Sequence, residues 1–310
     1  MARVVLTGAT GFIGTHLLHA CLEAGDECAI TSRVHFDHPD AEVFEVDIRH
    51  RDRCRVLTDW KPEVVYHLAA YHHVGRSFQQ PEECFDVNAK GSANIIDACP
   101  DAHVVYMSSS EVYGHQHSVP WTEDLLPRPQ SPYAVTKYAG ECHALQAHRQ
   151  GRRVTAVRPF NVFGPGQSEH AVIGEFIRRA LAGEVIHTTP GQQTREFNYV
   201  TNIVDGLRAV VSKAYLGGPI NLAGGEEIAV SDLLHEIIVR TDSGSEVFTD
   251  LPHRPNEIWR MRGSSVLAEM ELGWTPAVSF SDGLDKTIAW YRENYHPCEG
   301  GQDGWMASHR

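Results

Sequence analysis

Three glycines placed three residues apart set the strongest constraint on what this chain can fold into. Gly8, Gly11 and Gly14 directly follow the short apolar run 3–7, and they open a segment of helically spaced apolar residues that ends at Gly25. Gly8 permits a tight turn, Gly11 lets the backbone approach a diphosphate at the helix N-terminus, and Gly14 lets helix and strand pack closely. The pattern predicts a strand, a turn and a helix that together bind a dinucleotide.

The alternation of strand and helix continues through the first half of the chain. Further apolar, strand-like runs lie at 27–31, 43–46, 64–68, 104–108 and 154–158. The segments between them are long enough for crossover helices. We therefore expect an α/β fold of the Rossmann type, with a doubly wound parallel sheet and helices on both of its faces.

The character of the sequence changes after Gly164-Pro165-Gly166. Amphipathic helices are expected at 172–182 and 230–240 among loops rich in proline and glycine, with one more strand at 219–222. These features predict a smaller, interleaved C-terminal lobe. The expected domains are a dinucleotide-binding domain over 1–163, to which 195–224 return, and a second lobe over 164–194 and 225–297. We expect residues 298–310 to form a flexible tail.

Composition and charge narrow the class of protein. The 310 residues are 42% hydrophobic and 22% charged, as in globular proteins, and 27 Lys plus Arg against 40 Asp plus Glu give a net charge of −13. A surface this acidic repels phosphate backbones, so we expect no nucleic-acid partner.

Seven scattered cysteines without a C-x-x-C pair indicate reduced thiols and a cytoplasmic location. No run approaches the roughly 18 apolar residues of a membrane span. His72-His73 and His115-Gln-His117 lack ligand partners at metal spacing, so no metal is expected.

The end of the second expected strand bears on the choice of dinucleotide. An acidic residue there would hydrogen-bond the adenosine ribose of NAD and repel the extra phosphate of NADP, but the sequence reads Thr31-Ser32-Arg33. Arg33 is suited to pair with a 2′-phosphate, which favours NADP and leaves NAD as the alternative. Asp47-Ile48, after the third strand, would suit the adenine edge.

A tyrosine and a lysine four residues apart are candidates for acid–base chemistry. Tyr133 and Lys137 follow Ser131-Pro132 at the start of an expected helix, and their spacing places both on one helical face. A neighbouring ammonium and a cationic nicotinamide would lower the pKa of the phenol and make Tyr133 a usable base. The pair lies downstream of residues 108–114, a serine-rich strand end where open α/β sheets bind ligands.

Together these motifs resemble the extended short-chain dehydrogenase/reductase family, in its nucleotide-sugar epimerase/dehydratase branch. The resemblance spans nearly the whole chain and includes the glycine motif, His67-Leu-Ala-Ala70, Asn88, the serine-rich strand end, Tyr133 with Lys137, Arg158-Pro-Phe-Asn161 and Arg195-Glu-Phe-Asn-Tyr-Val200. It implies an enzyme that acts on a nucleotide-diphosphate sugar. Ser109 and Tyr133 would hydrogen-bond the sugar 4-hydroxyl, Lys137 would hold the nicotinamide ribose, and hydride would pass from C4 to the cofactor.

The motifs and the resemblance place further contacts by position. For the cofactor these are Gly8, Gly11, Phe12, Ile13, Gly14, Arg33, Asp47, Ile48, Leu68, Ala69, Ala70, Asn88, Tyr133 and Lys137. For the substrate they are His73, Ser110, Asn161, Val172, Arg195 and Arg254. The two arginines match those that clamp the diphosphate. The resemblance also implies a homodimer in which the helices carrying 94–99 and 138–147 pair across a twofold axis.

Glu111 bears on which reaction follows oxidation at C4. A 4-keto sugar has an acidified C5–H, so a carboxylate at this position can remove that proton and then assist loss of water from C6. Ser109-Ser110-Glu111 resembles the Thr-Ser-Glu of GDP-mannose 4,6-dehydratases, and the stretch from His73 to Pro81 is also similar to those enzymes. Because Ser110 cannot act as the acid, Glu111 would serve as both base and acid, or His73 would help. We therefore expect a 4,6-dehydratase with a GDP-mannose-like substrate.

Several alternatives stay open at this point. Within the same family they are a 4-epimerase, a UDP-glucuronate decarboxylase, a hexosamine 5,6-dehydratase and a 4-ketoreductase. The 4-ketoreductase is included because part of this sequence resembles the reductases that act after GDP-mannose dehydratases. Outside it stands a non-catalytic dinucleotide-binding module. The joint presence of Ser109, Glu111, Tyr133 and Lys137 counts against that module, which would not need all four.

Overall fold

The fold is known from a computed structural model that describes residues 1–34, 36–253 and 257–294. The expected tail over 298–310 lies outside the described residues. The central element is a parallel sheet of seven strands in the order β10-β6-β5-β4-β1-β2-β3. Its strands are β1 (Arg3–Thr7), β2 (Glu27–Ser32), β3 (Ala41–Glu45), β4 (Val64–His67), β5 (His103–Met107), β6 (Val154–Pro159) and β10 (Gly217–Leu222). Each predicted strand is present within two residues of its expected bounds, which confirms the α/β fold class.

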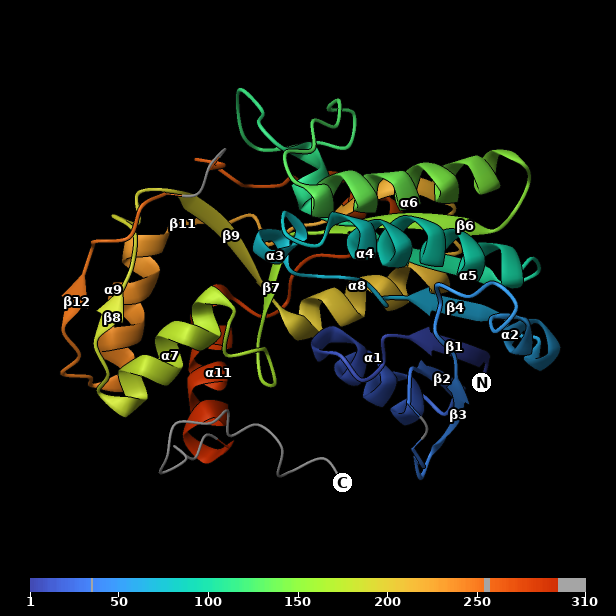
Figure 1. Cartoon of the computed structure of the whole chain (residues 1–310), viewed down its shortest axis with the longest axis horizontal. Helices are drawn as coiled ribbons and strands as arrows, with labels where there is room; N and C mark the ends of the chain where they lie inside the picture. Colours follow the sequence, from blue (N-terminus) through green and yellow to red (C-terminus); the bar gives the residue numbers. More distant parts are fainter. Residues whose placement is uncertain (35, 254–256, 295–310) are drawn as a thin grey trace.

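Helices cover both faces of this sheet (Figure 1). One face is covered by α1 (Phe12–Glu23), α8 (Val200–Ser212) and α10 (Val266–Leu272), and the other by α2 (Arg55–Trp60), α5 (Ser92–Ala98) and α6 (Pro132–Arg149). Alternate side chains of one strand enter the two cores, since Leu6 packs with Leu17 and Leu207, whereas Val5 packs with Ile95. Burial on both faces explains the continuous apolar runs of the sequence.

Short helical segments connect β4 to β5 and β5 to β6. After β4 the chain forms α3 (Val74–Ser77), α4 (Pro81–Phe85) and the π-helical turn η1 (Asp86–Gly91), which runs directly into α5. After β5 it forms the 3₁₀ turn η2 (Ser110–Tyr113). Under η2 lies a small apolar cluster of Tyr113, Trp121, Phe160, Ala223, Ile258 and Met261.

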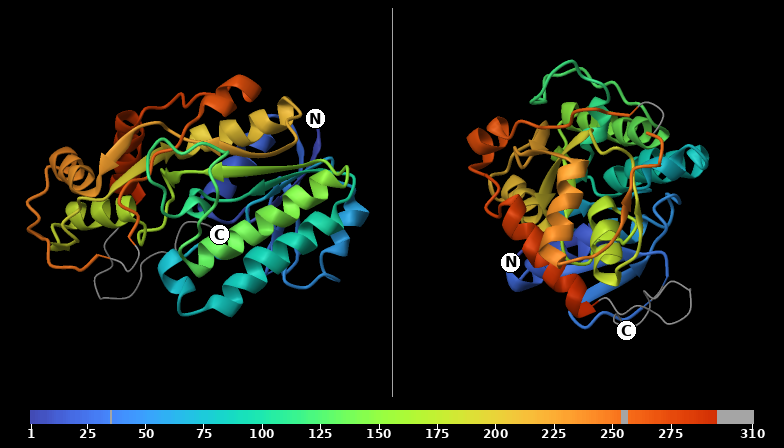
Figure 2. Two further views of the ribbon diagram at one scale, coloured as in Figure 1. Left: turned by 90° about the horizontal axis from the view of Figure 1, so that it is seen from above. Right: turned by 90° about the vertical axis from the view of Figure 1, so that its left-hand side faces the viewer.

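A second group of elements lies at one end of the molecule, away from the edge strand β3 (Figures 1 and 2). It comprises β7 (Asn161–Phe163), α7 (Val172–Ala182), β8 (Ile186–His187), β9 (Thr194–Tyr199), β11 (Glu227–Ala229), α9 (Val230–Thr241), β12 (Val247–Phe248) and α11 (Phe280–Asn294). We call this group the second lobe. Strands β11, β9 and β7 form its main sheet, and its core is a separate apolar cluster that includes Phe163, Ile177 and Ile288. The helices expected at 172–182 and 230–240 are α7 and α9, the latter one residue longer.

The order of the strands determines where a ligand can bind. From β1 the chain goes to β2 and β3 on one side of the sheet, and it then returns to β4 on the other side. A crevice opens at such a reversal, beyond the carboxyl ends of the strands.

Among the helices of the described ranges, none has both the length and the apolar composition required to cross a bilayer.

Candidate active site

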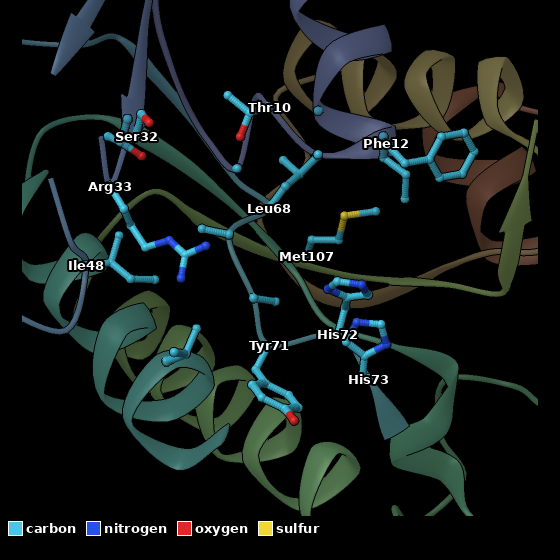
Figure 3. A pocket seen from close by; sticks show the side chains of 18 of the residues that line it. Thr10, Phe12, Ser32, Arg33, Ile48, Leu68, Tyr71, His72, His73 and Met107 are labelled. Carbon is cyan, nitrogen blue, oxygen red and sulfur yellow. The ribbon is translucent and has the colours of Figure 1, made fainter. Parts of the chain in front are cut away.

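A cavity of about 660 Å³ opens at this reversal, beyond the carboxyl ends of β1, β2 and β4 (Figure 3). Its walls come from the loops after these strands, from α4, and from residues 167–171 on the path to the second lobe. Predicted site residues that line it are Gly8, Gly11, Phe12, Ile13, Gly14, Arg33, Asp47, Ile48, Leu68, Ala69, Ala70 and His73. The cavity therefore gathers the glycine loop and three strand ends predicted from the sequence.

The glycine loop fits a diphosphate because no side chain can occupy it. Gly8 has a φ of +75°, and a Cβ atom there would lie 2.7 Å from the amide nitrogen of Ala69. A Cβ atom on Gly14 would lie 2.1 Å from the carbonyl oxygen of Gly8, so β1 and α1 can approach only with glycine at this position. Gly11 precedes α1 and provides no side-chain cap. The first N–H groups of the helix are thus available to an anion.

Two arginines, Arg33 and Arg49, lie at one end of the cavity. This is the end where Asp47 and Ile48 predict that the adenosine binds. Arg49 donates to Asp47 from Nε at 3.0 Å and from Nη2 at 2.6 Å, and this pairing lowers the pKa of the Asp47 carboxyl. Arg33 points into the cavity and, within the described residues, forms no ion pair (Figure 3). Sequence reasoning missed Arg49, although it stands directly after Asp47-Ile48.

Asn88 lies behind the cavity wall and does not line it. Its side chain accepts from the amide of Tyr71 at 2.8 Å and donates to the carbonyl of Tyr71 at 3.0 Å. It also donates to Thr136 Oγ1 at 3.2 Å. The carboxamide, completely buried in the π-helical turn, therefore fastens the loop after β4 to α6.

His67 supports the same wall from beneath. Its Nδ1 is 2.6 Å from Thr7 Oγ1 and its Nε2 is 2.9 Å from Ser92 Oγ. Burial, with a smaller contribution from Lys137, lowers the pKa of His67 to about 3. The ring is therefore neutral near pH 7, and it links β1, β4 and α5 under the glycine loop.

Ser109, Glu111 and Tyr133 come together where β5 ends and α6 begins. The Ser109 hydroxyl accepts from the amide of Glu111 at 3.2 Å, and it lies near enough to the Tyr133 phenol to favour the ionised form of that phenol. Burial raises the pKa of Tyr133 to about 12; the Ser109 hydroxyl opposes this rise, and the Glu111 carboxylate adds to it. Tyr133 is also fixed at its amide, which donates to Ser77 Oγ at 3.1 Å.

Lys137 lies one helical turn further along α6. Its ammonium donates to the carbonyl oxygen of Met107 and lies 4.8 Å from the centre of the Tyr106 ring. Because Met107 lines the cavity, Lys137 stands directly behind the wall. Burial lowers the pKa of Lys137 to about 7, and the nearby Glu141 carboxylate partly opposes this shift.

Three of the six residues predicted to bind substrate occupy two places. His73 lines the cavity with its ring 3.9 Å from that of His72, and burial lowers the pKa of both, that of His72 to about 4. Ser110 and Asn161 meet at the sulfur of Met261, at 3.7 and 3.3 Å.

Of the other three, two lie in the second lobe and one lies outside the described part of the chain. Val172 packs in the apolar core of the second lobe, and Arg195 pairs with Glu257 and donates to the carbonyl of Ile258 at 2.6 Å. Arg254 lies outside the described residues.

Further cavity-lining residues were not predicted from the sequence. They are Thr10, Thr31, Ser32, Val46, Arg49, Tyr71, His72, Arg76, Gln80, Glu83, Val87, Met107, Gln167, Ser168 and Ala171. Thr31, Ser32 and Val46 adjoin predicted residues in the chain. Nothing in the local sequence indicates that residues 167–171 fold back over the glycine loop.

Known proteins are similar to this chain in sequence and in fold. The model of the NAD dependent epimerase/dehydratase family matches residues 4–223, more than half of the chain. A dTDP-D-glucose 4,6-dehydratase of Bos taurus is 31% identical over 95% of this chain and 90% of that protein. A UDP-glucose 4-epimerase of Mycolicibacterium smegmatis is 32% identical over 94% of this chain and 98% of that protein. The crystal structure of a dTDP-glucose 4,6-dehydratase of Streptomyces venezuelae with NAD bound has a TM-score of 0.87 at 28% identity, covering 94% of this chain and 97% of that one. The chain belongs to the NAD dependent epimerase/dehydratase family and is an enzyme of its nucleotide-sugar branch, the dehydratases and epimerases of the short-chain dehydrogenase/reductase type.

Proposed function

We propose that this enzyme is a nucleotide-diphosphate-hexose 4,6-dehydratase. The observation that carries the proposal is the position of Glu111, whose amide is held by Ser109 and whose carboxylate acts on the phenol of Tyr133. A second acid–base group thus lies close enough to the residue proposed to act at C4 to raise the pKa of its phenol. A 4-epimerase needs only to turn the ketone and has no use for a carboxylate at this position.

Tyr133 is the base that takes the proton of the 4-hydroxyl. A nicotinamide dinucleotide held at the glycine loop of Gly8, Gly11 and Gly14 would supply the hydride acceptor for C4 and the hydride donor for C6. With a pKa of about 12 the phenol is protonated near pH 7, so added positive charge is needed to make it a base. The ammonium of Lys137, one turn away on the same face of α6, supplies part of that charge.

Glu111 acts at C5 and C6 once the ketone stands at C4. Its carboxylate removes the C5 proton, which the ketone acidifies, and the protonated acid gives that proton to the departing 6-hydroxyl, so that water leaves. After the hydride has returned to C6, C5 takes up a proton from solvent. Ser110 is held by Met261 and is not an acid at neutral pH, so both roles fall to Glu111.

We propose NADP as the dinucleotide, with NAD as the alternative. Arg33 supports NADP because it is an unpaired cation, within the described residues, at the cavity end that Asp47 and Ile48 predict for the adenosine. The Streptomyces venezuelae dehydratase was solved with NAD, which supports the alternative. Denaturing the purified protein and identifying the released dinucleotide by mass spectrometry separates the two.

The nucleotide and the sugar stay predictions. The stretch from His73 to Pro81 supports a GDP-mannose-like substrate, whereas dehydratase relatives are named for dTDP-glucose. Arg195, partly buried beside Glu257, is the proposed diphosphate contact within the described residues.

A homodimer is the proposed assembly, with the helices that carry 94–99 and 138–147, α5 and α6, proposed to pair across a twofold axis. Beside α4 and α6 lies a shallow groove lined by Pro81, Phe85, Pro132 and Val135, and the side chains of Phe85 and Val135 are 53% and 49% exposed. A second copy would cover this apolar surface. Val135→Glu should then shift the mass measured by light scattering from two chains to one, and an unchanged mass would reject this interface.

The reaction is tested by incubating the protein with GDP-, UDP-, dTDP- and CDP-sugars in deuterated water. A product lighter by one water and carrying one deuterium at C5 would support dehydration and name the nucleotide. An isomer of unchanged mass would make the enzyme an epimerase, as the Mycolicibacterium smegmatis relative is named, and Glu111 would need another explanation. Release of carbon dioxide from a uronate would indicate a decarboxylase.

A further inference from the structure

One face of α6 carries three polar side chains at intervals of four residues. They are Tyr133, Lys137 and Glu141, and this spacing stacks them one turn above another. The proposed chemistry uses the first two. Glu141 is completely buried, and no step of that chemistry needs it.

The Glu141 carboxylate joins α6 to the ends of two strands. Ser108 donates to its Oε2 at 2.6 Å, and Arg158 donates to the same oxygen from Nε at 3.0 Å and to Oε1 from Nη2 at 2.5 Å. Ser108 directly follows β5 and precedes Ser109, whereas Arg158 lies in β6. Oε2 therefore holds the strand end that carries Ser109, while both carboxylate oxygens hold Arg158 of β6.

The partner of Glu141 extends this contact to the turn that carries Glu111. The Arg158 guanidinium lies 4.5 Å from the ring centre of Tyr113, the last residue of η2. The Tyr113 hydroxyl donates to Asn221 Oδ1 at 2.7 Å, which ties η2 to β10. The ion pair thus lies between α6, the Ser109 strand end and the Glu111 turn.

The charge of Glu141 also acts on Lys137. The carboxylate favours the ammonium form and raises the pKa of Lys137 against the larger effect of burial. Removing this charge leaves burial less opposed, so the pKa of Lys137 should fall. Less ammonium would then support the Tyr133 phenolate at a given pH.

We propose that Glu141, paired with Arg158, is a positioning residue that holds the Ser109 strand end and the Glu111 turn against the Tyr133–Lys137 face of α6. Its bearing on turnover rests on the proposed function. The effect of Glu141 on the pKa of Lys137 does not rest on the proposed function. An experiment on Lys137 can therefore test the role of Glu141 even if the proposed function is wrong.

The test compares the full-length protein with Glu141→Gln, which keeps the shape of the side chain and removes its charge. Nitrogen NMR of protein labelled at lysine Nζ, assigned with Lys137→Met, follows the titration of Lys137 without any sugar. The expected result is a midpoint at least about one pH unit lower in Glu141→Gln. On the sugar that the wild type accepts, kcat should fall about ten-fold or more, its acid limb should move to higher pH, and KM should change little.

Thr287→Val is the matched control, because Thr287 is another completely buried polar side chain, on α11 and remote from Tyr133. It can lower the unfolding temperature but should leave the Lys137 midpoint and the pH limb unchanged. If folded Glu141→Gln keeps the wild-type midpoint, or if the control shifts it equally, the proposal is wrong. If the wild type turns over no nucleotide sugar, the proposed function fails, while the Lys137 titration still decides the role of Glu141.

Ser108→Ala covers the case in which Glu141→Gln does not fold. It removes one hydrogen bond that a neutral hydroxyl donates to the Glu141 carboxylate and leaves the ion pair with Arg158 intact. The proposal expects a loss in kcat of about ten-fold with the Lys137 midpoint unchanged, because the strand end is released but the charge remains. Wild-type kcat in Ser108→Ala would overturn the positioning role.

Discussion

Arg33→Ala tests the proposed preference for NADP. Arg33 lines the cavity and has no ion-pair partner among the residues that the structure describes, so its charge is available to a ligand. NADP differs from NAD by one phosphate on the adenosine ribose, and only that phosphate gains from the guanidinium. The variant should therefore weaken NADP binding and leave NAD binding nearly unchanged.

The size of the effect follows from exposure and charge. Arg33 is exposed, so the value for water applies, about 1 kcal/mol for two unit charges 4 Å apart. A phosphate monoester with nearly two negative charges doubles this to about 2 kcal/mol. That corresponds to a loss of about thirty-fold in the Kd for NADP. Added salt should reduce the loss, because the pair is open to solvent.

Calorimetric titration with NADP, NAD, and the fragments 2′,5′-ADP and AMP measures this directly, at low and at high ionic strength. Arg51→Ala is the control, because Arg51 is an exposed arginine of the same domain that pairs with Asp97 at 3.5 Å and does not line the cavity. It should change neither Kd by more than about two-fold. Equal losses for NADP and NAD in Arg33→Ala would remove the structural reason for choosing NADP.

Three other changes test the site and its support. Tyr133→Phe removes the hydroxyl that lies near Ser109 and should lower turnover by about 10²–10⁴-fold while a direct binding assay still detects the dinucleotide; near-normal turnover would reject Tyr133 as the base. Glu111→Gln should leave C4 oxidation visible as transient reduced cofactor and should stop exchange of the C5 hydrogen in deuterated water, so continued exchange would rule out its role at C5. Burial lowers the pKa of His67 to about 3 in the folded protein, whereas the unfolded chain protonates this residue below about pH 6.5. The unfolded state therefore binds more protons than the folded state in this range. The free energy of unfolding should fall by about 1.4 kcal/mol per pH unit as the pH falls from about 6.5 towards 3. Urea unfolding at about pH 7 and pH 5 should show a flatter dependence in His67→Gln than in the wild type, and an equal dependence in both would contradict this account.

The parts of the site that local residue types determine could be predicted from the sequence. The glycine loop is one, because its backbone angles and its approach to the loop after β4 exclude a Cβ atom. The strand ends at Arg33, Asp47 and Leu68 are another, because parallel strands with crossover helices place their carboxyl ends at one edge. For the same reason the cavity contains most of the predicted cofactor residues.

The parts that depend on distant contacts could not be predicted. Asn88 was placed at the cofactor by its motif, but a π-helical turn directs its side chain to Tyr71 and Thr136 behind the wall. The pairing of Arg195 with Glu257 joins residues that are 62 positions apart. The Glu141–Arg158 pair has no local pattern that distinguishes it from an exposed helix charge. In each case the partner is fixed only when separate elements pack.

The path of the chain between its two halves has a consequence for engineering. The second lobe is assembled from three separate stretches, β7 to β9, β11 to β12, and α11, while α8 with β10 and then α10 return to the large sheet between them. No single cut in the chain separates the second lobe from the seven-stranded domain. Replacing one contiguous segment with that of a relative would thus exchange only part of the second lobe. We therefore expect a change of substrate range to require the exchange of several surface loops together. We therefore expect limited proteolysis to yield no fragment that folds on its own.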